Sequence, residues 1–360
     1  MDARRLSLAV GDCADYRRVA MSDVPSDTLD RPLRDLRISV TDRCNFRCGY
    51  CMPADIYHED YNFLPSDQLL DFDGIERLTR IFVGLGVEKV RITGGEPLLR
   101  PELPKLIARL ARIDGLRDLT LTTNGYMLAD HAQALADAGL QRITVSLDSL
   151  EPEAFARNVG VKREVARVLA GIDAAEAAGL SPIKLNCVVR RGVNESAVED
   201  LTRRFRDTPH VVRFIEYMDV GTLNRWHRDE VVPADEILAR VSADAALESV
   251  PPSYKGEVAR RYRYADHTGE IGVIASVTQP FCGDCNRARI SADGRLITCL
   301  FATEGRDLAT PMQEGDDDDA LRALITETWS ARTDRYSEQR AQLRANDPER
   351  VRLEMYQIGG

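Results

Sequence analysis

The sequence predicts an α/β fold built on a parallel sheet, followed by a C-terminal region of different character. Between residues 36 and 218, six short runs rich in β-branched residues alternate with segments whose apolar residues recur every three or four positions. Beyond residue 220 this alternation stops. An open α/β sheet and a barrel both satisfy the pattern, and both place ligand chemistry at the carboxyl ends of the strands.

The six predicted strands each end in residues that could take part in chemistry. The strands are LRISVT, KVRITGG, LTLTTNG, RITVSLD, IKLNCVV and VRFIEYM, starting at residues 36, 89, 119, 142, 183 and 212. Helical periodicity is clearest in residues 101–113, 130–140 and 163–180. TDRCNFRC follows the first strand and GGEP the second, and TNG, SLDS, NCVV and EYMD end the other four. We therefore expect the functional residues to gather at one end of the sheet.

The regions on either side of the alternation carry fewer signals. Residues 1–33 are polar and weakly periodic, with turn-forming prolines, and are predicted to be a mobile arm with some local structure. Residues 34–220 form the predicted α/β domain, and residues 221–360 a C-terminal domain with a helical tail. The acidic run Asp316 to Asp319 is interpreted as a solvated loop.

The composition is that of a folded protein without a broad basic surface. The chain has 360 residues, 44% of them hydrophobic, with a formal net charge of -10 and a pI near 5.2. This charge argues against general nucleic-acid binding, which needs a basic surface to displace counterions. The sequence also lacks a long apolar run and an N-terminal signal-peptide core. We expect a cytoplasmic protein with no nucleic-acid or membrane partner.

Six of the eight cysteines fall into two triplets, which favours metal or cluster ligation over disulfides in a reducing compartment. Cys13 and Cys187 are left over. The first triplet is Cys44, Cys48 and Cys51, at C-x3-C-x2-C spacing. Such close thiolates suit a [4Fe-4S] cluster or a zinc ion. Three protein ligands would leave one iron open for a reactive partner, whereas a structural zinc would borrow a fourth ligand, for which His58 is the nearest candidate.

The second triplet is Cys282, Cys285 and Cys299, and it also lacks a fourth cysteine. A second cluster would again have an open iron, and the alternative is a zinc site completed by a distant residue such as His267. Arg287 and Arg289 follow Cys285 and are separated by one residue, so on an extended segment both guanidiniums point to the same face. Paired guanidiniums are typical of phosphate recognition.

The first triplet is similar to a known cofactor-binding motif. With Tyr50 just before its last cysteine, and GGEP at residues 94–97 after the next strand, it resembles the radical S-adenosylmethionine superfamily. The resemblance implies a partial (β/α)6 TIM-type barrel, with S-adenosylmethionine on the open iron of a [4Fe-4S] cluster. In that superfamily an electron from the cluster cleaves the sulfonium to methionine and a 5'-deoxyadenosyl radical. Gly94 and Gly95 would let the backbone approach the amino group of this ligand.

The full set of motifs resembles one family in that superfamily, the GTP 3',8-cyclases of molybdenum cofactor biosynthesis. The likeness runs from about residue 33 to the C-terminus, and FCGDCNRARISADGRLITC at residues 281–299 is its most discriminating part. It implies a C-terminal extension with a second [4Fe-4S] cluster, whose open iron contacts the guanine of GTP. The implied product is (8S)-3',8-cyclo-7,8-dihydroguanosine 5'-triphosphate. The radical takes the ribose 3'-hydrogen and C3' then attacks C8, a task of positioning that needs no acid–base pair.

The resemblance also implies which residues contact each ligand. S-adenosylmethionine would contact Tyr50, Gly95, Ser146 and Met218. GTP would contact Arg37, Arg91, Thr122, Lys184, Arg213, Arg287, Ala288 and Arg289. The terminal Gly359 and Gly360 would form a flexible tail that enters the active site.

Two other functions fit parts of the sequence. A radical S-adenosylmethionine peptide maturase with an auxiliary cluster would usually carry more auxiliary cysteines, and it leaves Arg287 and Arg289 unexplained. A non-enzymatic interaction protein would use zinc or clusters only for stability. The cyclase resemblance implies GTP as substrate, an unidentified electron donor and a following enzyme that makes cyclic pyranopterin monophosphate, and it allows a homodimer.

Overall fold

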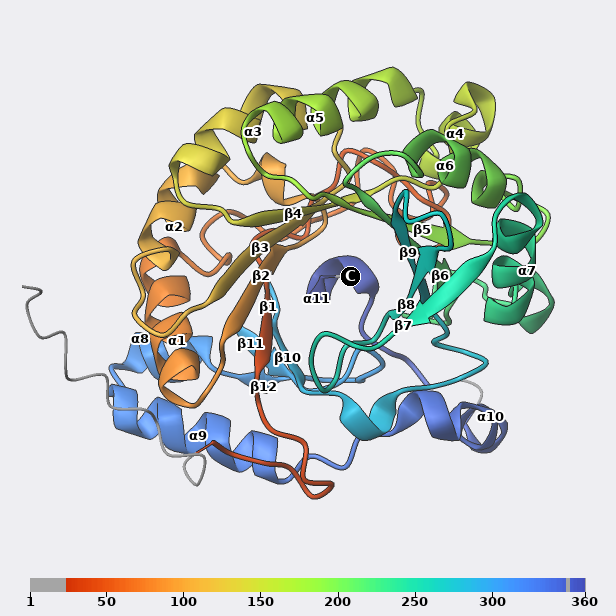
Figure 1. Cartoon of the computed structure of the whole chain (residues 1–360). Helices are drawn as coiled ribbons and strands as arrows, with labels where there is room; N and C mark the ends of the chain where they lie inside the picture. Colours follow the sequence, from red (N-terminus) through yellow and green to blue (C-terminus); the bar gives the residue numbers. More distant parts are fainter. Residues whose placement is uncertain (1–23, 348–349, 360) are drawn as a thin grey trace, which may run out of the picture.

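The computed structural model describes residues 24–347 and 350–359. Their strands form one sheet in the order β12-β11-β10-β1-β2-β3-β4-β5-β6-β9-β8-β7 (Figure 1). β1 to β6 are parallel neighbours in sequence order, as expected for successive β-α units. They are β1 (Asp35–Ser39), β2 (Lys89–Thr93), β3 (Asp118–Thr123), β4 (Arg142–Ser146), β5 (Lys184–Val189) and β6 (Val211–Glu216).

Helices cover the outer face of these strands, and the sheet curves around a central space (Figure 1). They are α1 (Phe72–Gly84), α2 (Leu103–Leu110), α3 (Leu128–Asp137), α4 (Pro152–Val159), α5 (Val165–Ala177) and α6 (Ala197–Phe205). The predicted helical segments 101–113 and 163–180 contain α2 and α5, and the segment 130–140 overlaps α3, which begins two residues earlier. The sheet has two ends, at β12 and β7, so the predicted partial (β/α)6 barrel is confirmed. Among the described helices, none is both long and apolar enough to cross a membrane.

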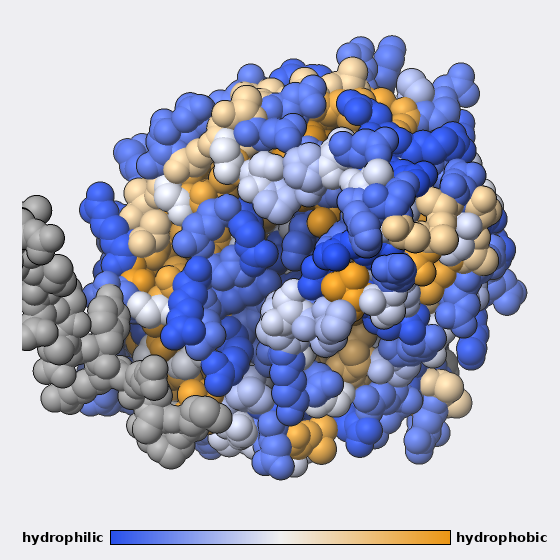
Figure 2. All heavy atoms as spheres, viewed as in Figure 1, coloured by the Kyte–Doolittle hydropathy of each residue, from blue (hydrophilic) through white to orange (hydrophobic). Residues whose placement is uncertain are grey.

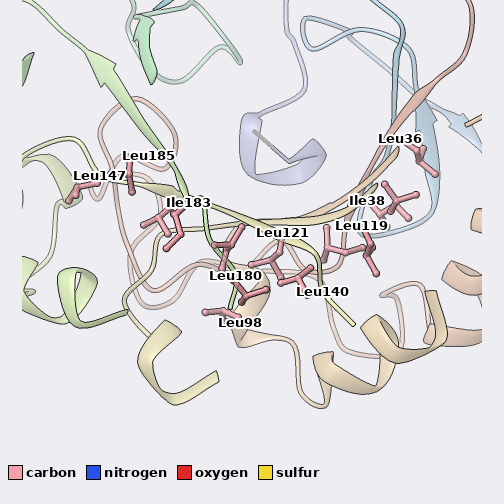
Figure 3. Packing of buried hydrophobic residues seen from close by; sticks show 14 of the residues in the cluster. Leu36, Ile38, Leu98, Leu119, Leu121, Leu140, Leu147, Leu180, Ile183 and Leu185 are labelled. Carbon is pink, nitrogen blue, oxygen red and sulfur yellow. The ribbon is translucent and has the colours of Figure 1, made fainter. Parts of the chain in front are cut away.

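The strands separate a hydrophobic outer face from a polar inner face. Leu36 and Ile38 of β1 and Leu119 and Leu121 of β3 are at most 2% exposed and lie between the sheet and the helices (Figure 3). Arg37 lies between two of them in the sequence, so its side chain points to the opposite face of the sheet. The same period of two that predicts the strands therefore directs their polar residues into the barrel.

The C-terminal region extends this sheet at both ends. β10 pairs in parallel with β1, and β9 pairs in parallel with β6. The added strands are β7 (Leu247–Val250), β8 (Arg260–Tyr264), β9 (Glu270–Ile274), β10 (Arg287–Ile290), β11 (Arg295–Ile297) and β12 (Arg306–Asp307). The added helices are α7 (Ala234–Asp244), α8 (Ala309–Glu314), α9 (Asp318–Ser330), α10 (Tyr336–Asn346) and α11 (Met355–Ile358). The sheet includes strands from both sides of residue 220 and so does not divide there. The domain boundary at this residue therefore stays a prediction.

The segment before β1 is packed where the structure describes it. Leu33 is 0% exposed, Arg31 is 2% exposed, and the hydroxyl of Thr28 donates to the carbonyl oxygen of Arg332 at 2.7 Å. The expectation of a mobile arm therefore does not hold for residues 24–33. The rest of that predicted arm, with Cys13, lies outside the described residues.

The acidic run has a structural role at its C-terminal half. The carboxylate of Asp317 accepts a hydrogen bond from the backbone N–H of Ala320 at 2.9 Å and so caps α9. Asp318 and Asp319 lie in the first turn, where the positive end of the helix dipole favours negative charge. The run is exposed to solvent, as predicted, but Asp318 and Asp319 belong to α9, so the interpretation as a loop is wrong for these two residues.

Candidate active site

A cavity at the centre of the curved sheet contains both cysteine triplets. Its lining includes Cys44, Cys48 and Cys51 from the loop after β1, and Cys282, Cys285 and Cys299 from the segments beside β10 and β11. Figure 2 shows this face of the molecule hollowed near its centre, among mostly hydrophilic residues. Each of these six cysteines is partly exposed and is a free thiol. Two triplets that are far apart in the sequence thus share one space.

Hydrogen bonds shape the loop of the first triplet. Arg47 donates from Nη1 to the carbonyl oxygen of Cys44 at 2.7 Å, and from Nε to that of Tyr57 at 2.5 Å. The backbone N–H of Phe46 points at the Sγ atom of Cys44 from 3.4 Å. Burial raises the pKa of the Cys44 thiol to about 12. A metal would therefore have to displace the proton of this thiol on binding.

The GGEP turn holds this cysteine loop against the sheet. A Cβ atom on Gly95 would lie 2.3 Å from the carbonyl oxygen of Arg43, so only glycine allows the two backbones to meet. Next to it, the carboxylate of Glu96 accepts hydrogen bonds from the backbone N–H of Asn124 and the hydroxyl of Thr123, both at 2.7 Å. This turn therefore positions the first triplet in addition to facing the cavity.

Tyr50 is fixed by a buried carboxylate at the end of β4. Its hydroxyl donates to Oδ2 of Asp148 at 2.8 Å, while Oδ1 accepts from the backbone N–H of Val188 at 2.9 Å. Burial raises the pKa of Asp148 to about 6. Ser146 and Met218 line the same cavity, so all four residues assigned to S-adenosylmethionine, Gly95 included, lie together.

The second triplet has arginine donors on one of its thiols. The Sγ atom of Cys285 accepts from Nη2 of Arg287 at 3.6 Å and from Nη2 of Arg332 at 3.4 Å. Burial alone would raise the pKa of this thiol, but the charges of these two guanidiniums outweigh burial and lower the pKa to about 6. Cys285 is therefore the thiol of this triplet best prepared to bind a metal as thiolate.

Basic side chains from four strands form a layer on the inner face of the barrel: Arg37, Arg91, Arg213, Arg287 and Arg289 all line the cavity. Nη1 of Arg91 donates to the hydroxyl of Thr122 at 2.8 Å. The pKa of Arg213 is lowered to about 9 and that of Arg289 to about 10. Burial is the larger cause, and repulsion from neighbouring arginines is the second. The Nε atoms of Arg37 and Arg287 are buried and find no hydrogen-bond partner within residues 24–347 and 350–359. Such crowded, partly unpaired guanidiniums favour a polyanionic ligand.

The C-terminal tail reaches this basic layer. Nη1 of Arg289 donates to the carbonyl oxygen of Gly359 at 2.7 Å. Gly359 has a φ of 70°, and a Cβ atom there would lie 2.1 Å from Cγ2 of Thr93, so a side chain is excluded for two reasons. The predicted entry of the tail is thus seen at Gly359, while Gly360 lies outside the described residues.

A buried carboxylate anchors the tail to the barrel. Asp219, 0% exposed, follows β6 and pairs with Arg340, Arg344 and Arg352 at 2.8, 3.1 and 3.3 Å, and the hydroxyl of Tyr336 donates to it at 2.6 Å. Burial alone would raise the pKa of Asp219, but these partners outweigh burial and lower the pKa. The ion pairs of Asp219 therefore connect the end of β6 to the segment that carries α11.

Replacing Asp219 with asparagine should lower the free energy of unfolding by about 3 kcal/mol near neutral pH, because three guanidiniums then lose their buried partner. The carboxylate has a lowered pKa in the folded state, so it contributes stability above its unfolded pKa of about 3.9 and loses it as the pH falls through the folded pKa. Urea denaturation of both proteins from pH 7 to pH 3 should show a difference that shrinks at the acid end. A pH-independent difference would contradict the assignment of this effect to the Asp219 charge.

Family models divide the chain into two matched regions. The model of the radical SAM superfamily matches residues 38–205, and the model described as Molybdenum Cofactor Synthesis C matches residues 210–338. The first region contains the first triplet and β2 to β5, and the second contains the second triplet and β10.

Curated relatives match nearly the whole chain. A GTP 3',8-cyclase of Acidothermus cellulolyticus is 56% identical over 88% of this chain and 88% of its own length. A GTP 3',8-cyclase of Xanthomonas axonopodis pv. citri is 55% identical over 93% of this chain and 98% of its own length. One of Staphylococcus carnosus is 47% identical, also over 93% of this chain and 98% of its own length. The chain belongs to the GTP 3',8-cyclase family. The resemblance seen in its motifs is thereby confirmed.

Solved structures give the fold of this cyclase-family chain independent support. Streptococcus suis SuiB, in a crystal structure bound to S-adenosylmethionine, superposes with a TM-score of 0.54 at 16% identity, covering 81% of this chain and 68% of that one. Another crystal structure of SuiB gives 0.55 at 14% identity, covering 85% and 68%. At such low identity the likeness concerns the fold alone.

The thiols of the cyclase-family chain fit two [4Fe-4S] clusters. Each triplet presents three partly exposed thiols to the cavity, and N–H donors point at sulfur in both, as at Cys44, Cys285 and Cys299. Throughout residues 24–347 and 350–359, no three His, Cys, Asp or Glu side chains meet closely enough to hold a single metal ion. Neither triplet is thus preformed as a one-ion site.

Two residues assigned to GTP do not reach this cavity. The side chain of Ala288 is 0% exposed and packs in the hydrophobic core, because it points away from Arg287 and Arg289 on β10. Lys184, at the start of β5, lines a second cavity, which shares Arg213 with the first. Burial, followed by repulsion from Arg213, lowers the pKa of Lys184 to about 7. The positions of these two residues do not support direct contacts in the central cavity.

Some cavity residues were missed from the sequence. Asp148 lies within SLDS, and its place at a strand end was a usable signal. Asn186 shares its face of β5 with Lys184, and strand alternation predicts this. Arg31 and Arg332 also line the cavity, but neither lies in a strand or a recognisable motif.

Proposed function

We propose that the chain is a GTP 3',8-cyclase that converts GTP to (8S)-3',8-cyclo-7,8-dihydroguanosine 5'-triphosphate, the first step of molybdenum cofactor biosynthesis. The observation that carries this proposal is that both cysteine triplets and the basic layer line one cavity. A radical reaction on a nucleotide needs its cofactor and its substrate in such a shared space. Membership of the cyclase family supports the same reaction.

The proposed sites divide the cavity between cofactor and substrate. Cys44, Cys48 and Cys51 would hold the first [4Fe-4S] cluster, and Cys282, Cys285 and Cys299 the second. When bound, the first cluster and S-adenosylmethionine supply a 5'-deoxyadenosyl radical. Tyr50, fixed by Asp148, would bind the adenosine part of this cofactor together with Ser146 and Met218, and Gly95 would face its methionine part.

The basic layer would bind and orient GTP. A triphosphate carries several negative charges, and Arg37, Arg91 and Arg213 approach the cavity from three different strands. Arg287 and Arg289 lie beside the second triplet, so they would hold the nucleotide next to that cluster. Fixing the nucleotide at both ends keeps C3' and C8 close enough to bond, which is the main task of the protein.

The tail would help to close the reaction space. Arg289 holds Gly359 in the cavity, and the Asp219 network holds the segment leading to it. Excluding water and other hydrogen donors protects a radical from side reactions. The tail needs no acidic or basic side chain to close the reaction space in this way.

Several parts of the proposal concern the cellular setting. We place the protein in the cytoplasm, because the six cysteines of the triplets must stay reduced to bind iron. An electron donor must supply the reducing equivalent, and a following enzyme must convert the product to cyclic pyranopterin monophosphate. A homodimer is compatible with this setting.

Anaerobic protein with both clusters, mixed with dithionite, S-adenosylmethionine and GTP, should form 5'-deoxyadenosine and a cyclised guanosine triphosphate together. Mass spectrometry and chromatography follow both products. Formation of 5'-deoxyadenosine with a peptide but not with GTP would instead favour the peptide maturase. Absence of cleavage with either substrate, in protein shown to hold its iron, would contradict both enzymatic functions.

A further inference from the structure

Two buried arginines hold the loop that carries Cys282 and Cys285. Arg31 donates from Nη1 to the carbonyl oxygen of Cys282, and Arg332 donates from Nη1 to that of Cys285, both at 2.7 Å. Arg332 also donates from Nη2 to the Sγ atom of Cys285 at 3.4 Å. The side chains of Arg31 and Arg332 are 2% and 1% exposed. The two guanidiniums therefore act on the protein part of the second cluster site from within the fold.

A buried carboxylate joins these two guanidiniums. Oδ2 of Asp27, whose side chain is 0% exposed, lies 2.6 Å from Nε of Arg31 and 3.3 Å from Nη1 of Arg332. A second carboxylate, that of Asp334, lies 3.4 Å from Nε of Arg332, so both carboxylates help to hold this guanidinium where its Nη2 donor meets the sulfur of Cys285. Burial of these charges makes their interactions with nearby sulfur stronger than at a surface.

Arg332 is further restrained by its neighbours. Its guanidinium carbon lies 4.7 Å from the centre of the Trp329 ring, and the indole Nε1 of Trp329 donates to the carbonyl oxygen of Arg31 at 3.1 Å. The hydroxyl of Thr28 donates to the carbonyl oxygen of Arg332 at 2.7 Å. Arg332 is therefore held between the segment before β1 and the end of α9, with little freedom to leave Cys285.

Reduction adds one negative charge to an iron–sulfur cluster, so N–H donors and positive charge at its sulfur ligands favour the reduced state. We propose that Arg332, held by Asp27, is a positioning residue that raises the reduction potential of the second cluster through its donor on Cys285. Arg287 donates to the same sulfur, but it also faces the proposed substrate position. The inference rests on the proposed function only in treating the second triplet as a cluster site.

The test is a redox titration of the second cluster, followed by electron paramagnetic resonance. The full-length chain carries Cys44→Ala, Cys48→Ala and Cys51→Ala, so that only the second cluster gives a signal, and neither S-adenosylmethionine nor GTP is added. Adding Arg332→Gln should move the reduction potential of that cluster to more negative values. Arg335→Gln is the matched control, because it removes the same charge at an exposed position paired with Glu338, and it should leave the potential unchanged.

Arg332→Lys separates tuning from a purely structural role. Lysine keeps the charge but loses the two-pronged donor, so a smaller shift in the same direction is expected, with iron content unchanged. If Arg332→Gln loses the cluster, the lysine variant decides the question. A wild-type potential in whichever variant retains the cluster would overturn the proposal. The absence of GTP makes this outcome independent of whether the cyclase assay succeeds.

Discussion

Replacing Cys48 with alanine is expected to abolish cleavage of S-adenosylmethionine and to halve the iron bound by the reconstituted protein. The first triplet offers only three thiols, so a variant with two cannot hold its cluster, whereas the second triplet is formed by a different part of the chain. Two [4Fe-4S] clusters correspond to about eight irons per chain and one to about four. Iron analysis and chromatography of 5'-deoxyadenosine measure the two effects.

The Cys285→Ala variant provides the comparison that separates the two sites. It should also bind about four irons. It should still form 5'-deoxyadenosine, but it should form no cyclised product. Cys187→Ala is the matched control, because Cys187 is 0% exposed and lies outside both triplets, and its iron content should stay at wild-type level. Equal loss of cleavage in Cys48→Ala and Cys285→Ala would refute the division of roles between the clusters.

Replacing Arg91 with alanine is expected to weaken GTP binding by about 10- to 150-fold, since a hydrogen bond to a charged group contributes about 1.5–3 kcal/mol. Arg91 touches Thr122 and Thr144 and makes no hydrogen bond to either triplet, so both clusters should remain. Cleavage of S-adenosylmethionine without GTP should therefore persist. Equilibrium binding of GTP and the rate of 5'-deoxyadenosine formation measure the two properties separately.

Arg289→Ala should weaken GTP binding similarly and should also release the tail, because Arg289 holds the carbonyl oxygen of Gly359. Hydrogen exchange at the C-terminus would then increase in this variant and not in Arg91→Ala. Arg77→Ala is the control for loss of one arginine, since Arg77 pairs with Asp318 away from the cavity. Loss of cleavage together with GTP binding in both active-site variants would indicate a cluster or folding defect instead.

The sequence predicted the barrel because its signals are local. Each strand from β1 to β6 follows a period of two within a few residues, and the run LRISVT already places Arg37 opposite two buried residues. The pairing of β10 with β1 depends on contacts between segments about 250 residues apart, and no local pattern reports such contacts. The packed segment 24–33 escaped prediction for the same reason, since its partners include Arg332 and Cys282.

The site was predicted to the extent that it lies in motifs. The spacing of the cysteines alone indicated both triplets, and the strand alternation of Arg287 and Arg289 correctly placed their side chains on one face. The assignment of Ala288 to GTP ignored that same alternation. Arg332 carries no motif, and its importance becomes visible only through its contact with Cys285.

The central claim is that a radical formed at the first triplet acts on the ribose of GTP held beside the second. The most direct measurement uses GTP carrying deuterium at C3' and follows the label by mass spectrometry in the anaerobic reaction. Deuterium should appear in 5'-deoxyadenosine, with one cyclised nucleotide formed for each labelled molecule. Cyclised product accompanied by unlabelled 5'-deoxyadenosine, or labelled 5'-deoxyadenosine without any cyclised product, would contradict the account.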